Sequence, residues 1–217
     1  MERRRFVKGC VAGAAALGAA GRAAAGRAER YPRVALAEAG GAPLRGAALA
    51  PHEAYVFFYP FVSTPCLLLD LGAKVLPASG DAWPGGVGPR RSVVAYTAVC
   101  PHEWSHPDRD FSPIHYVAPG ERDVLVGDRD RLIVCCAHSS AFDPAAGGRV
   151  VQNPARLPLA SVLLEWDEAT DGLHAAGLRG PESFERFFAA FDRERRVVTE
   201  APRVLRLRDY SKAVARC

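Results

Sequence analysis

The sequence lacks three features that define other classes of protein: an apolar run long enough to cross a membrane, a basic stripe in its body, and internal repeats. The apolar stretch near its start, Gly9–Gly21, is 13 residues long, whereas a membrane-spanning helix needs about 20. Of the formal net charge of +4, residues 1–25 supply five basic residues against one acidic residue. The remainder is close to neutral and has no basic stripe interleaved with aromatic residues, so we predict no nucleic-acid partner.

The composition predicts one well-buried domain with extensions. The chain has 217 residues, and 49% of them are hydrophobic. This is enough to build a sizeable core without relying on disulfides. Only the N-terminal segment is compositionally biased, because it is rich in Ala and Gly.

Two short stretches of the chain each combine one cysteine with one histidine. They read Cys100-x-His102 and Cys135-x-x-His138. Two thiolates and two neutral imidazoles form a metal-ligand set, and this set suits a [2Fe–2S] centre in which one iron is bound by two cysteines and the other by two histidines. The same four residue types also fit a tetrahedral zinc site.

The distribution of these ligands favours the two-iron cluster. Structural zinc sites usually keep like ligands together, whereas here each loop offers one Cys and one His, as a cluster bound from both loops requires. Ser140 lies where its hydroxyl can donate a hydrogen bond to a cluster sulfide, and Pro154-Ala155 is expected to form a third, covering loop. A purely structural role for the four residues is the third interpretation.

These motifs resemble the Rieske iron–sulfur protein family, and within it the small subunit of arsenite-oxidase-type complexes. The likeness covers residues 31–180. It is carried by the two ligand stretches together with Pro84-Gly85-Gly86-Val87-Gly88-Pro89, Val94-Ala95-Tyr96 and Ser140-Ala141-Phe142-Asp143-Pro144. The resemblance implies a Rieske-type [2Fe–2S] cofactor held by Cys100, His102, Cys135 and His138, with Ser140 beside it.

The sequence also departs from the family pattern. Many members have a disulfide between the two ligand loops, but the corresponding positions hold Ser105 and Ala137. Many place a Tyr hydroxyl against a ligand sulfur, but Phe142 stands there. Fewer hydrogen bonds to the sulfurs stabilise the reduced cluster less. We therefore predict a potential below that of the quinol-oxidising members, within the family range of about −150 to +300 mV. The stretch 103–134 is an insertion beside the cluster.

The predicted fold is all-β, an antiparallel sandwich or small barrel. Turn signals separate short runs rich in Val, Leu and aromatic residues. These predicted strands are Ala54–Tyr59, Cys66–Leu71, Ser92–Val99, Asp123–Val126, Leu132–Cys136, Ser161–Trp166 and Gly172–Ala176. The resemblance implies that a cluster-binding subdomain, at about residues 98–158, is inserted into the base domain.

Residues 181–217 are predicted to form a C-terminal helix and a basic tail. Phe184, Phe187, Phe188 and Phe191 recur at helical spacing within Pro181–Arg195, and we expect this stripe to pack on the β-domain. From Arg203 onward, five basic residues face one acidic residue. The tail would lie on an acidic partner, on an anionic membrane surface or in solvent.

Residues 1–30 are predicted to be a twin-arginine export signal. Arg3-Arg4-Arg5-Phe6-Val7-Lys8 precedes the apolar stretch, and Ala23-Ala24-Ala25 offers a cleavage site. Because a cluster inserted in the cytoplasm must cross the membrane in a folded protein, the signal and the cofactor support each other. We expect a periplasmic protein, which an uncleaved N-terminus would tether to the membrane.

Three cysteines remain after Cys10 and the two ligands are set aside, so at least one of them is unpaired within the chain. Cys66 is expected to be a buried core residue. Cys136 would replace Cys135 as a ligand only through a register shift, and Cys217 has no evident role. His106 and His115 are expected to be loop residues rather than ligands, and His52 and His174 to be structural.

The resemblance implies a one-electron relay that performs no catalysis of its own. In the arsenite-oxidase-like interpretation, a larger molybdenum subunit oxidises the substrate and this chain passes electrons to a cytochrome. The alternative is the Rieske subunit of a quinol–cytochrome c reductase, with cytochrome b and c1-like partners. A Rieske oxygenase would need a second domain with a mononuclear iron site, for which the chain is too short. A non-redox zinc-binding β-domain is the remaining alternative.

Overall fold

The structure is a computed structural model and describes residues 27–77, 83–180, 182–191 and 194–217. The predicted export signal lies outside these residues up to position 26, and so does the side chain of Phe184. Within the described part of the chain, no helix is both long and apolar enough to cross a membrane.

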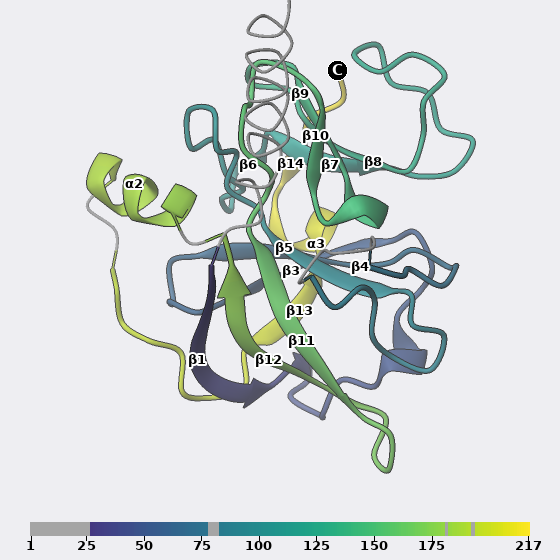
Figure 1. The fold of residues 1–217 in the computed structure, drawn as a ribbon, viewed down its shortest axis with the longest axis vertical. Helices are drawn as coiled ribbons and strands as arrows, with labels where there is room; N and C mark the ends of the chain where they lie inside the picture. The colour runs from purple at the N-terminus through teal and green to yellow at the C-terminus, as the bar shows by residue number, and fades with distance from the viewer. Residues whose placement is uncertain (1–26, 78–82, 181, 192–193) are drawn as a thin grey trace, which may run out of the picture.

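The larger of the sheets formed by the described residues has eight strands (Figure 1). In spatial order they are β1 (Ala28–Ala35), β12 (Gly172–Arg179), β11 (Ser161–Asp167), β5 (Val93–Thr97), β4 (Pro65–Asp70), β3 (Ala54–Phe58), β13 (Arg203–Arg206) and β2 (Ala37–Glu38). The edge strands β1 and β2 are separated along the chain by Leu36 alone. The sheet therefore curls until its two edges nearly meet.

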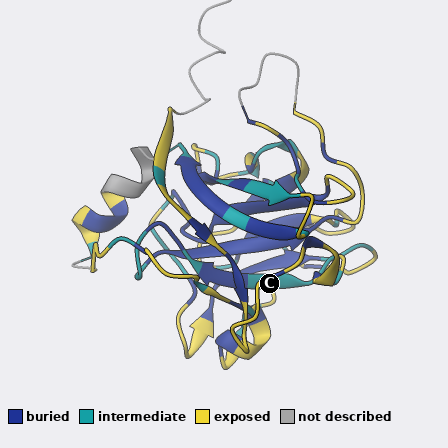
Figure 2. Cartoon of the chain, turned by 90° about the horizontal axis from the view of Figure 1, so that it is seen from below, coloured by how far each residue is buried: buried dark blue, intermediate teal, exposed yellow. Residues whose placement is uncertain are grey.

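The central strands β4 and β5 are buried on both faces (Figure 2). Because side chains alternate across a strand, Leu68 and Ala95 enter one core, the inner core, which lies inside the curled sheet. Leu67 and Tyr96 point the other way, into a second core on the outer face of the sheet, the outer core. This two-sided burial explains why β4 and β5 are continuous apolar runs rather than alternating ones.

A smaller four-stranded sheet covers the outer face of these strands. Its order is β10 (Arg149–Gln152), β9 (Ser140–Asp143), β8 (Leu132–Cys135) and β7 (Ile114–Val117). It is inserted in the chain between β5 and β11. The buried Tyr96 hydroxyl donates to the carbonyl of Pro144 at 2.6 Å, which ties β5 to the turn that follows β9.

The described part of the segment after residue 180 contains two helices and two strands, where the sequence predicted one helix and a basic tail. Helix α2 (Glu182–Ala190) packs the buried Phe187 and Phe188 on the inner core. Strand β13 then joins the large sheet between β3 and β2, followed by α3 (Leu207–Tyr210). Finally β14 (Ala213–Val214) pairs in parallel with β6 (Phe111–Ser112) beside the smaller sheet. This last pairing brings the chain's final residues to the subdomain.

The all-β prediction is confirmed, with one wrong strand. Residues 123–126 form a bridge and a turn rather than a strand, because the amide of Gly127 donates to the carbonyl of Asp123 at 2.7 Å and closes the chain on itself. The prediction missed strands β1, β2, β6, β7, β9, β10, β13 and β14.

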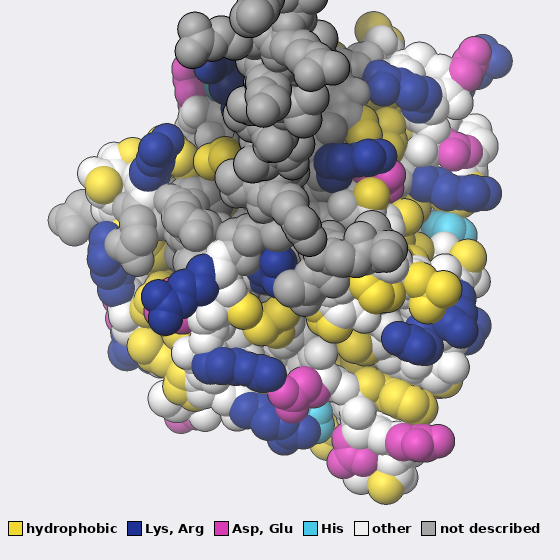
Figure 3. Space-filling model, viewed as in Figure 1, with side chains coloured by type: hydrophobic (Ala, Val, Ile, Leu, Met, Phe, Trp, Pro, Cys, Tyr) yellow, Lys and Arg dark blue, Asp and Glu magenta, His cyan; other side chains and the backbone are white. Residues whose placement is uncertain are grey.

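Charged side chains are spread over the face of the molecule drawn in Figure 3, where several Lys and Arg side chains lie next to Asp or Glu. Glu165 on β11 pairs with both Arg30 and Arg33 of β1, at 3.0 and 2.9 Å. Exposed pairs of this kind contribute little to stability, and they neutralise part of the basic charge locally.

Candidate metal centre

The two predicted ligand stretches lie where strands end. Cys100 follows β5, and a turn forms behind it because the amide of Trp104 donates to the carbonyl of Cys100 at 2.8 Å. This turn carries His102. Cys135 is the last residue of β8, and His138 lies in the tight turn to β9.

The two thiols meet in the interior. Cys100 and Cys135 are both fully buried within the outer core. The hydrogen bond from the Cys135 thiol lowers the pKa of Cys100 to about 7, with further help from the backbone amide of His102 and the hydroxyl of Ser140. The same contact, together with burial, raises the pKa of Cys135. A cation bound by the two sulfurs would displace their protons.

The two imidazoles form a second pair closer to the surface. The rings of His102 and His138 lie edge to face, with centroids 4.9 Å apart. The Nδ1 atom of His102 is buried and has no hydrogen-bond partner. The Nε2 atom of His138 is 3.0 Å from the carboxylate of Glu103, which leaves Nδ1 of that ring for a ligand.

An unpartnered buried nitrogen is costly unless something binds it. Its orphaned state beside a second imidazole, on the same two turns that follow the buried thiols, fits a metal centre. The donor set fits an iron–sulfur cluster with mixed ligation. It also satisfies the ligand types of zinc.

Ser140 and the third loop complete the surroundings. Ser140 is fully buried at the start of β9, and its hydroxyl oxygen accepts a bond from the amide of Ala155 at 3.0 Å. Because that oxygen accepts from Ala155, its own proton is free to point at the sulfur of Cys100. Ala155 belongs to the same core as both thiols. The Pro154-Ala155 segment therefore does lie against the predicted centre.

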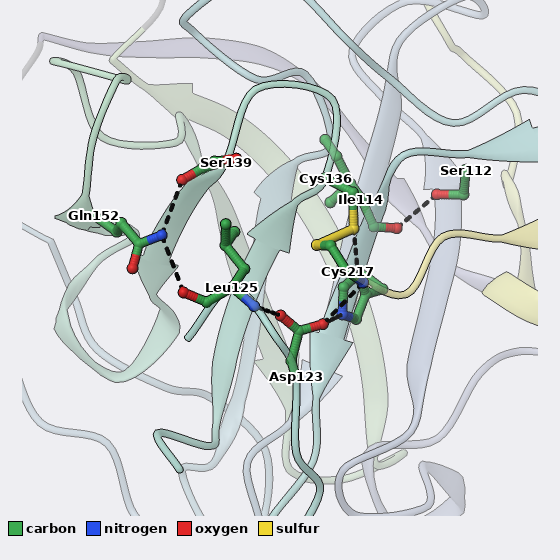
Figure 4. Close-up of a disulfide and its surroundings, with 9 residues drawn as sticks. Ser112, Ile114, Asp123, Leu125, Cys136, Ser139, Gln152 and Cys217 are labelled. Atoms are coloured by element: carbon green, nitrogen blue, oxygen red, sulfur yellow. Dashed lines mark hydrogen bonds and ion pairs between the residues drawn. A yellow bond between two sulfur atoms is a disulfide. The ribbon is translucent and has the colours of Figure 1, made fainter. Parts of the chain in front are cut away.

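Two residues differ from the prediction. Cys217, which had no predicted role, forms a disulfide with Cys136 (Figure 4). His115 is a buried residue of β7 rather than a loop residue, and its Nε2 atom lies 3.1 Å from the carboxylate of Asp123. The three cysteines outside the predicted signal and the ligand set left room for one disulfide, but connectivity cannot be read from sequence.

Other predicted assignments agree with the structure. Cys66 is fully buried in the inner core, and its thiol donates to the carbonyl of Tyr59 at 3.1 Å. His106 lies in a loop and packs against the rings of Phe187 and Phe191, at 5.1 and 5.5 Å. It stands apart from the His102–His138 pair.

The curled sheet, with the inserted four-stranded sheet against its outer face, has the all-β architecture of a Rieske-type domain. The chain is similar to the crystal structure of the soluble domain of the Rieske protein II (soxF) from Sulfolobus acidocaldarius. The two share 26% sequence identity with a TM-score of 0.52, over 68% of this chain and 78% of that one. This likeness supports the Rieske family and, with the donor set, an iron–sulfur cluster. No family model matches the sequence.

Proposed function

We propose that this chain is a one-electron carrier with a [2Fe–2S] cluster, in which Cys100 and Cys135 bind one iron and His102 and His138 bind the other. When bound, such a cluster takes up and releases a single electron. The observation that carries the proposal is the sorting of the donors: the thiols are buried together, and the imidazoles lie together nearer the surface. A single tetrahedral ion needs no such separation.

The protein's own residues would set how electrons enter and leave. The side chain of His138 is 38% exposed, so its ring would give a docked partner direct access to the centre. Glu103, which is more exposed, holds that ring in place through Nε2. The buried thiols and Ser140 exclude water from the inner side.

Analysis of the purified protein tests the cofactor directly. We expect two irons and two acid-labile sulfides per chain, and a rhombic EPR signal after dithionite reduction, as mixed Cys/His ligation implies. A protein that is loaded with one zinc, contains no sulfide and gives no EPR signal would overturn the proposal in favour of a zinc-binding domain.

We further propose that the chain is exported by its twin-arginine signal and works in the periplasm as the relay subunit of a larger oxidoreductase. The arsenite-oxidase-like motifs favour a molybdenum subunit as electron donor and a cytochrome as acceptor. Isolation of the native assembly tests this. Copurification with a molybdenum-containing subunit supports the proposal, whereas copurification with a cytochrome b supports the quinol–cytochrome c reductase alternative.

A further inference from the structure

The second ligand loop, residues 135–140, is held from outside the centre at both ends. Next to Cys135, Cys136 is joined by a disulfide to Cys217, with Cα atoms 5.6 Å apart. Near the other end, the carbonyl of Ser139 accepts a hydrogen bond from the Nε2 atom of Gln152 at 3.2 Å. Figure 4 shows the two fixed points, Cys136 and Ser139, and His138 lies between them in the sequence.

Both attachments lead to the same place, the turn at residues 123–127. The amide of Cys217 donates to the carboxylate of Asp123 at 3.2 Å, and the Cys217 carbonyl accepts from the amide of Val124 at 2.5 Å. Gln152 uses the same Nε2 group to donate to the carbonyl of Leu125 at 3.3 Å. One turn therefore anchors the loop through a covalent arm and a hydrogen-bonded arm.

Asp123 is itself held by a buried histidine. The Nε2 atom of His115 lies 3.1 Å from its carboxylate, and the Nδ1 atom lies 3.7 Å from the sulfur of Cys136. A carboxylate only accepts hydrogen bonds, so Nε2 carries the proton. Burial lowers the pKa of His115. The neutral ring thus contacts both the turn and the disulfide.

The C-terminal segment that carries Cys217 is itself fixed to the protein by backbone hydrogen bonds. The segment before Cys217 pairs with β6, and the amide of Ala215 donates to the carbonyl of Ser112 at 2.8 Å. Further back, the amide of Lys212 donates to the carbonyl of Arg109 at 2.9 Å. The arm that reaches Cys136 is therefore bound to the protein along its length.

We propose that the Cys136–Cys217 disulfide, the 123–127 turn and Gln152 act together as a brace that positions the second ligand loop. The brace does the work of a disulfide between the two ligand loops, for which Ser105 and Ala137 leave no cysteines. Cys136, Cys217 and Gln152 are positioning residues, since they act through Cys135 and His138. This inference rests on the proposed cluster.

The test compares the holoprotein with the double variant Cys136→Ala/Cys217→Ala, which leaves no unpaired thiol behind. Changes to residues that support metal ligands typically cost about 10–100-fold in affinity or activity. We expect the variant to lose its cluster roughly 10–100-fold faster and to show shifted EPR g-values. Gln152→Leu should shift them in the same sense, to a smaller extent.

A phosphine reductant provides a matched control. It should accelerate cluster loss in the folded wild-type protein and leave the double variant unchanged, because that variant has no disulfide to reduce. Cys66→Ala, in the inner core far along the chain from the loop, should lower the melting temperature without changing the EPR spectrum. If the double variant does not fold, the brace is tested by comparing cluster loss in the wild-type protein with and without the reductant, and by comparing the wild-type protein with Gln152→Leu.

Two results would overturn the brace. One is a double variant that melts earlier but keeps the wild-type spectrum and cluster lifetime, since the disulfide would then only stabilise the fold. The other is unchanged amide hydrogen exchange at residues 135–140 in the double variant. This measurement needs no cluster, so it tests the brace even if the wild-type protein carries none and the proposed function fails. Faster exchange at residues 135–140 in the variant supports the brace.

Discussion

His138→Ala is expected to abolish the mixed-ligand EPR signal and to release most of the iron. The substitution removes one of the two imidazoles that lie edge to face with centroids 4.9 Å apart. Among the described residues, no other histidine has a ring nitrogen in the group of donor atoms formed by His102, Glu103 and His138. Loss of a direct ligand should exceed the roughly 10–100-fold effect of changing a supporting residue. Iron and sulfide content, measured with the EPR signal, checks the result.

His106→Ala is the matched control for this prediction. It removes an imidazole only four positions from His102, but one that packs on Phe187 and bonds the carbonyl of Trp104 at 2.7 Å. We expect the cluster and its spectrum to survive. If His106→Ala erased the signal while His138→Ala preserved it, the ligand assignment would be wrong.

The two Cys/His stretches stand out in the sequence because the spacing of their donors is local. Cys100 and His102 lie in one turn, as do Cys135 and His138, and spacing within a turn limits which donors can reach one metal. Strands β4 and β5 could likewise be predicted, because burial on both faces makes each of them a continuous apolar run. These features depend on residues that are close in the chain.

The missed features depend on residues that are far apart. Cys136 and Cys217 are separated by 81 positions, and nothing in either neighbourhood specifies the partner. Strand β1 has mostly exposed side chains, so no apolar alternation marks it, and it becomes a strand by pairing with β12. The basic residues around β13 read as a tail, although Val204 between them is buried in the inner core.

Ser140→Ala is expected to lower the reduction potential of the cluster. The Ser140 hydroxyl is buried and helps to lower the pKa of Cys100 by a hydrogen bond. Reduction adds negative charge near the sulfurs, so a donated hydrogen bond stabilises the reduced state more than the oxidised state. Phe142 offers no hydroxyl nearby, which makes Ser140 the more important donor.

The size of the shift follows from the strength of that bond. A hydrogen bond to a charged group contributes about 1.5–3 kcal/mol, and about 1.4 kcal/mol corresponds to 59 mV for one electron. The potential of Ser140→Ala should therefore fall by at most roughly 60–130 mV, as measured by protein-film voltammetry or an EPR-monitored titration.

Ser139→Ala provides the control, because Ser139 is exposed and contributes its carbonyl rather than its hydroxyl to the bond with Gln152. Its potential should match that of the wild type. Ser140→Ala also deprives the amide of Ala155 of its acceptor, so a lower melting temperature is expected as well. A variant that melts earlier yet keeps the wild-type potential would assign Ser140 to the third loop alone, with no hydrogen bond to the cluster.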